Sequence, residues 1–184
     1  MIGTNKHQYL PGDLSSVGPA EGRKNVLVPY EFLQNTALTG KYIELMQRHG
    51  YTVYFKPRND EPLDQQIDAH LLSEKSRAKL KIFEEINDES MKRIDIVAGA
   101  QTTLVFDLLP YRKETWVLDS DFKMLTELVD SGLAKLVRLE HFAEDVSRRL
   151  PEPDWDFQLE RYCSSRKLEE VIGIHLGSGL CREK

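Results

Sequence analysis

Short apolar segments alternate with segments of helical periodicity along most of the chain, and this alternation strongly constrains the fold. The apolar segments predict strands, because they are brief and rich in aliphatic and aromatic residues. Strands that alternate with helices are typical of a parallel sheet covered by helices on both faces. We therefore expect an α/β protein with a Rossmann-like three-layer α/β/α sandwich and a mainly parallel sheet of about six strands. The expected strands are 25–29, 52–56, 81–84, 95–98, 115–118 and 134–138.

Amphipathic segments between these strands predict the helices. The first begins at Asn35 or Thr36 and runs to about His49, where Gly50 ends it. A polar segment at 63–80 is also expected to be helical, with its apolar side chains facing inward. Those side chains are Ile67, Leu71, Leu72 and Leu80, and the other helices are expected at 88–93, from 101 onward, at 122–131, at 140–150 and at 155–172.

Glycine, proline and serine indicate where the domain begins and ends. Residues 1–24 are poor in core-forming side chains and predict an irregular leader or linker. Residues 25–150 are expected to form the Rossmann-like domain. Pro151 and Pro153 then break the chain, so 151–184 predicts a helix that packs back on the domain, followed by a flexible tail.

Charge and composition exclude several classes of protein. A net charge of −5 argues against a nucleic-acid-binding protein, which needs a basic surface. No apolar run reaches the roughly 20 residues of a membrane span. The five histidines are scattered, and Cys163 and Cys181 lack the spacing of metal ligands, so we expect no metal site. Unpaired thiols fit a reducing compartment, and we expect a cytoplasmic location.

The segment Asp95–Pro110 is the strongest candidate for a binding site. It reads as a buried strand, a turn at Gly99 and Ala100, and a helix that starts at Gln101, Thr102 and Thr103. The first backbone N–H groups of a helix lack internal partners and favour an anion there. The alternative is that Thr102 only caps the helix and Gly99 only turns the chain.

Four further charged residues lie where strands meet loops or early in the central helix. Lys56 ends the second strand and Arg58 follows it; both are suited to bind a phosphate or carboxylate, unless they are solvated charges. Asp107 is suited to accept hydrogen bonds from a ribose diol, or else is a solvent-facing or capping acid. Glu31 follows the first strand and is a candidate base or hydroxyl ligand, although a loop glutamate is usually solvated.

Common cofactor and nucleophile motifs are missing from the sequence. No GxGxxG follows the first strand, which argues against a nicotinamide or flavin site. Walker A, GxSxG and HExxH motifs are also missing. We therefore expect no cofactor, and no catalytic residue is identified.

The segment from Asp95 to Leu118 resembles the nucleotide-sugar-binding, C-terminal half of GT-B fold glycosyltransferases, a pattern shared by sugar-nucleotide 2-epimerases. Those domains have a strand, a small-residue turn, hydroxyl residues, an acid on the helix, then a GKP-like turn and a strand. The segments 26–29, 53–58 and 129–137 resemble other βα units of the same half. The resemblance extends over roughly residues 24–172.

The resemblance implies roles for particular residues. It implies that Arg58 faces the donor and that Asp107 stands where many relatives place a ribose-binding glutamate. Arg112 and Glu114 depart from the usual glycine and proline of the GKP-like turn. It also implies that the diphosphate is contacted by Gly99, Ala100, Gln101, Thr102 and Thr103.

Three functions remain open at this point. The chain is the donor-binding half of a glycosyltransferase in polysaccharide biosynthesis, or a non-catalytic module that binds a nucleotide or phosphorylated ligand, or an interaction domain with an empty site. Two-domain relatives have an N-terminal acceptor half, and only 24 residues precede the first strand here. We therefore expect a nucleotide sugar or nucleoside diphosphate as ligand, and an acceptor-domain protein or a second copy of the chain as partner.

Overall fold

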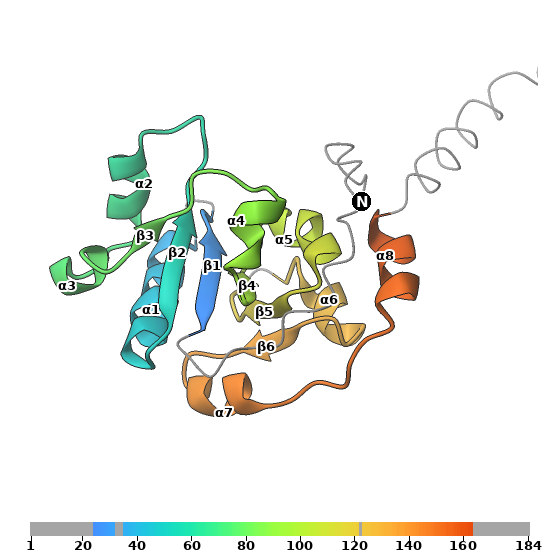
Figure 1. Cartoon of the computed structure of the whole chain (residues 1–184). Helices are drawn as coiled ribbons and strands as arrows, with labels where there is room; N and C mark the ends of the chain where they lie inside the picture. The colour runs from blue at the N-terminus through green and yellow to red at the C-terminus, as the bar shows by residue number, and fades with distance from the viewer. Residues whose placement is uncertain (1–23, 32–34, 122, 164–184) are drawn as a thin grey trace, which may run out of the picture.

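The structure, a computed structural model, describes residues 24–31, 35–121 and 123–163. These residues form a six-stranded sheet in the order β3-β2-β1-β4-β5-β6, and every neighbouring pair is parallel (Figure 1). The predicted α/β class and parallel sheet are therefore confirmed. The strands are β1 (Asn25–Pro29), β2 (Thr52–Lys56), β3 (Lys81–Ile82), β4 (Ile96–Gly99), β5 (Glu114–Leu118) and β6 (Lys135–Val137).

Helices cover both faces of the sheet and complete the three predicted layers. The helices α1 and α7 pack on one face, while α4, α5 and α6 pack on the other, where α8 lies against α5 and the 3-10 helix η1 (Figure 1). The helices that precede β4 in the chain are α1 (Thr36–Arg48), α2 (Leu63–Ala69), α3 (Glu74–Arg77) and α4 (Asp88–Lys92). Those that follow are α5 (Leu104–Asp107), η1 (Leu109–Tyr111), α6 (Thr126–Asp130), α7 (Phe142–Ser147) and α8 (Trp155–Cys163).

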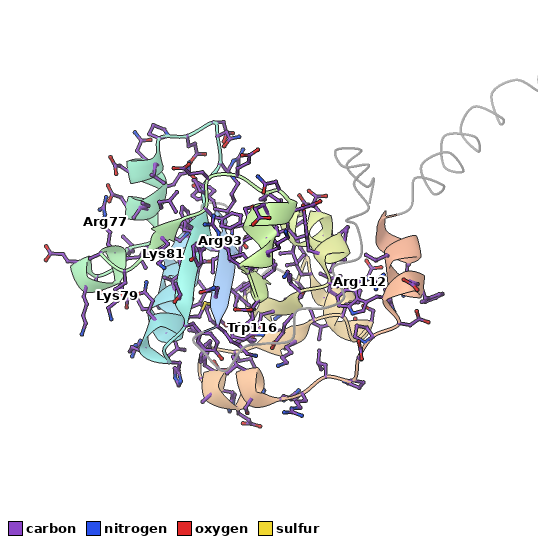
Figure 2. All side chains as sticks on the ribbon, in the orientation of Figure 1. Arg77, Lys79, Lys81, Arg93, Arg112 and Trp116 are labelled. Atoms are coloured by element: carbon purple, nitrogen blue, oxygen red, sulfur yellow. The ribbon has the colours of Figure 1, made fainter. Side chains whose placement is uncertain are left out.

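Each face of the sheet has its own apolar core. Trp116, near the middle of the molecule in Figure 2, is fully buried beneath α1 and α7, with its ring edge-on to Tyr51 and Phe142. The opposite core contains Met91 of α4 and Val105 of α5. On that side Arg112, labelled in Figure 2, connects the end of η1 to α8 through an ion pair with Asp156.

The long helix predicted at 63–80 is wrong, because two short helices occupy this segment. The chain leaves the helical conformation at Leu71, which has a left-handed backbone (φ 52°) and a side chain that is 76% exposed. Leu71 therefore faces solvent and not the core. Ile67 is buried, and Leu72 and Leu80 pack against core residues as predicted.

The helix after β4 is much shorter than its apolar pattern predicts. Gly99 is the last residue of β4, and α5 has only four residues before η1 begins. Pro110 lacks an N–H group and cannot continue an α-helix, and Arg112 adopts a left-handed backbone that ends η1 (φ 51°). The predicted leader up to residue 23 and the tail from residue 164 lie outside the described residues.

The strand order places the switch point of the sheet between β1 and β4. From β1 the chain proceeds through β2 to β3 on one side, and from β4 through β5 to β6 on the other. In sheets of this kind ligands bind beyond the carboxyl ends of the strands at such a switch. The loops after β1, β2 and β4 therefore surround one edge of three adjacent strands.

Candidate functional site

The loops that follow β1 and β4 meet through the side chain of Glu31. The backbone N–H of Ala100 donates to Glu31 Oε1 at 2.7 Å, and the N–H of Gln101 donates to Oε2 at 3.1 Å. Each carboxylate oxygen thus accepts a hydrogen bond from one of two consecutive backbone amides at the switch point. The structure confirms that these loops lie together, and it shows that the amides already hold an anion from the chain itself.

The Glu31 carboxyl group is fully buried, and its pKa reflects this environment. Burial raises the pKa to about 7, while the hydrogen bonds from the backbone of Ala100, Gln101 and Thr102 act in the opposite direction. Desolvation disfavours the charged form of an acid, and backbone donors favour it. Here desolvation is the larger effect, so the group titrates near neutral pH.

Gly99 is required by the packing around this carboxyl group. A Cβ atom at Gly99 would lie 2.7 Å from Cγ2 of Val105, 3.2 Å from Oε1 of Glu31 and 3.2 Å from Cγ2 of Thr102. The space beside its Cα atom is therefore filled by three side chains of the protein. The residue lets α5 and Glu31 approach the end of β4 closely.

The threonines after this turn have different roles. Thr102 Oγ1 accepts a hydrogen bond from the Leu104 N–H at 3.3 Å, although Thr102 precedes the N-cap position of α5. Thr103 is the N-cap residue of α5, but its exposed side chain makes no capping hydrogen bond. Asp107 is half-buried and lies at the other end of this short helix, one turn from Thr103.

Lys56 is the last residue of β2 and Arg58 follows it, and the partners of these two cations differ. The Arg58 guanidinium donates to both carboxylate oxygens of Asp60, at 2.9 and 2.6 Å, so its charge is paired on the loop. The Lys56 ammonium donates to the carbonyls of Pro57 at 3.1 Å and Glu84 at 3.0 Å, and it forms no ion pair within the described residues. Half-burial lowers the pKa of Lys56. Arg58 is therefore paired with a carboxylate, whereas Lys56 is bound only by backbone carbonyls among the described residues.

Gln66 and His70 organise the loop after β2, and the sequence contains little signal for this role. Gln66 is fully buried; its Oε1 accepts from the Arg58 N–H at 2.8 Å and its Nε2 donates to the carbonyls of Arg58 and Glu61 at 2.8 and 2.7 Å. His70 is four residues later, its Nδ1 donates to the Gln66 carbonyl, and its ring packs edge-on to Tyr30. The only signal was their i,i+4 spacing on one helix face.

We expect a Gln66→Met substitution to lower the free energy of unfolding by about 2 kcal/mol, because a buried side chain would lose its three hydrogen bonds to the loop backbone. Urea unfolding measures this change. Gln65→Met is the matched control, since Gln65 is exposed on the same helix. Equal effects of the two substitutions would show that Gln66 does not hold the loop.

Two further properties of the described residues concern metal binding and membrane spanning. Within the part of the chain that the structure describes, no group of three or more His, Cys, Asp or Glu side chains is arranged to hold a metal ion. None of the helices in the same residues is both long and apolar enough to cross a membrane.

No protein-family model and no curated protein matches the sequence. Among solved structures, the complex of S. aureus MnaA with UDP is similar with a TM-score of 0.53 and 13% identity, covering 88% of this chain and 48% of that chain. Methanocaldococcus jannaschii UDP-GlcNAc 2-epimerase in complex with UDP-GlcNAc and UDP has a TM-score of 0.55 and 14% identity, covering 84% and 45%. The chain therefore has the fold of about half of these proteins, as the resemblance predicted.

Proposed function

We propose that this chain binds the diphosphate of a nucleotide sugar at the carboxyl ends of β1, β2 and β4. One observation supports this most directly: the amides of Ala100 and Gln101 at the switch point already bind a carboxylate. Both similar structures contain UDP, so UDP and its sugars are the first ligands to test.

The proposed contacts follow the geometry of the three loops. The diphosphate would lie against the segment from Gly99 to Thr103, where the exposed Thr103 hydroxyl is an additional donor. A cation after β2 would neutralise charge on the ligand, and both Arg58 and Lys56 are at this edge. Asp107 is proposed to accept hydrogen bonds from the ribose hydroxyls.

The finer proposal is that the chain is the donor-binding domain of a GT-B type glycosyltransferase. A second domain or subunit would supply the acceptor and the catalytic base. The chain's own contribution would be electrostatic, because amide N–H groups and a cation stabilise the diphosphate as it leaves the sugar. Cytoplasmic polysaccharide biosynthesis remains the setting that we expect for such an activity.

A second candidate function is an interaction or regulatory module with the same fold and no catalytic activity. The observation that favours it is the state of the charged groups at the switch point. The Glu31 carboxylate accepts hydrogen bonds from the amides of Ala100 and Gln101, and Arg58 forms an ion pair with Asp60. A shared fold by itself does not establish an activity.

We expect UDP and UDP-GlcNAc to raise the thermal unfolding temperature, whereas UMP raises it much less because it lacks the second phosphate. A ligand that binds only the folded state stabilises that state by about 2.7 kcal/mol when its free concentration is 100 times its Kd. Thermal shift with UDP, UDP-GlcNAc, CDP and UMP measures this. If no nucleotide diphosphate shifts the transition, the interaction-module function is favoured.

Two substitutions then test the location of the site. Thr102→Val removes a hydroxyl from the loop after β4, and Arg58→Ala removes a cation from the loop after β2. Each should weaken UDP binding measured by calorimetry. Unchanged affinity in both variants would place the ligand elsewhere, even if UDP stabilises the wild-type chain.

A further inference from the structure

The environment of Glu31 differs from that of the other fully buried carboxylate in the described residues. Asp145 is 1% exposed and receives two hydrogen bonds from the Arg138 guanidinium, at 2.7 and 3.0 Å, which hold its pKa below the usual range. Glu31 is 0% exposed and forms no ion pair with any described residue. A buried carboxylate without a counter-ion is unfavourable, so this one depends on backbone donors alone.

Those donors are the groups that the proposed function assigns to the ligand. Each Glu31 oxygen accepts from one of two consecutive amides, which is the arrangement in which a phosphate oxygen pair is bound. The oxygens also fill the space beside Gly99, where Oε1 would lie 3.2 Å from an added Cβ atom. A diphosphate and the Glu31 carboxylate therefore cannot use these amides at the same time.

We propose that Glu31 is an internal competitor of the ligand, whose side chain must leave the amides of Ala100 and Gln101 before a diphosphate binds there. This inference rests on the proposed function and adds a regulated step to it. In the free protein the carboxylate satisfies the buried N–H of Ala100 and the partly buried N–H of Gln101. In the complex the diphosphate takes over that role.

The test is UDP binding to the wild type and to Glu31→Gln, measured by calorimetry at pH 8. Glutamine has nearly the same shape, but it carries no charge and has only one acceptor atom, so it holds the two amides less strongly. We expect UDP to bind Glu31→Gln about tenfold or more tightly than it binds the wild type. Glu84→Gln is the matched control, because Glu84 is exposed after β3 and its loss changes the net charge equally.

The outcomes separate the two proposals. Tighter binding by Glu31→Gln with an unchanged Glu84→Gln supports competition. Equal or weaker binding by Glu31→Gln overturns it while leaving UDP binding itself intact. If neither the wild type nor Glu31→Gln binds UDP or pyrophosphate, the proposed function fails, and the competition with it.

A second measurement on the wild type does not depend on how the variant folds. Addition of UDP should shift the amide NMR resonances of Ala100 and Gln101. The side-chain carboxyl resonance of Glu31 should move toward the value of a solvated glutamate. A Glu31 carboxyl resonance that stays unchanged in the saturated complex would contradict its displacement.

Discussion

A Gly40→Ala substitution is expected to lower the free energy of unfolding by about 3 kcal/mol or more. Gly40 lies in α1, where the backbone of His70 passes directly over it. A Cβ atom at Gly40 would be 1.8 Å from the His70 carbonyl oxygen and 2.9 Å from its carbonyl carbon. Backbone atoms cannot rotate away as a side chain can, so α1 and the end of α2 would have to separate.

The sign of this effect is informative, because helix propensity alone predicts the reverse. Alanine in a helix interior is favoured over glycine by roughly 1 kcal/mol. Gly50→Ala is a suitable control: Gly50 has a left-handed backbone (φ 86°) but no atom within 4 Å of the added Cβ. We expect that variant to lose only about 1 kcal/mol. A Gly40→Ala protein as stable as the wild type in urea would show that the contact with His70 is looser.

The contact at Gly40 also concerns the candidate site. His70 follows α2, and its ring packs against Tyr30, the residue before Glu31. Gln66 of the same helix holds the backbone of Arg58. Separation of α1 and α2 would therefore disturb the loop after β2, and we expect the variant to lose nucleotide affinity together with stability.

Strands were the part of the fold that the sequence predicted best. The bounds 25–29 and 52–56 match β1 and β2, because both segments are apolar runs ended by a proline or a cation–proline pair. Strands buried on both faces have a continuous apolar pattern that depends on few distant contacts. The proximity of the loops after β1 and β4 was predicted from the same alternation.

Helix lengths were predicted less well, for reasons that particular residues illustrate. Leu71 fits an inward-facing periodicity, yet it adopts a left-handed backbone and is exposed, because α2 ends where His70 packs on Gly40. The helix after β4 stops after four residues, although its apolar spacing continues. The end of α2 depends on a tertiary contact that a periodic pattern does not contain, whereas Pro110 is a local signal that limits the helix after β4.

The partners of the site residues could not be predicted from the sequence. Glu31 and Ala100 are 69 positions apart, and nothing local indicates that one binds the other. The sequence identified both as site candidates and placed them at the same sheet edge. It did not indicate that the carboxylate of one would occupy the amide of the other, since that depends on the depth to which Glu31 is buried.

A Glu31→Gln substitution is expected to change the pH dependence of stability by roughly 2–3 kcal/mol between pH 5 and pH 8. The pKa of Glu31 is about 7 in the folded protein, compared with an ordinary value of 4.5. An acid with a raised folded pKa contributes stability that is fully present below the unfolded pKa. That contribution is lost as the pH rises from 4.5 through about 7, because the buried group must then ionise.

The measurement is urea unfolding of both proteins at pH 5, 6, 7 and 8, and the informative quantity is the difference between them. Other groups titrate in this range; burial lowers the pKa of His70, so its contribution runs in the opposite direction and cancels in the difference. Relative to the wild type, Glu31→Gln should gain stability steadily toward pH 8. No charged side chain is among the causes of the raised Glu31 pKa. A difference that stays flat would therefore mean that the hydrogen bonds from the backbone amides fully offset the burial of the carboxyl group, so that its folded pKa lies near the ordinary value.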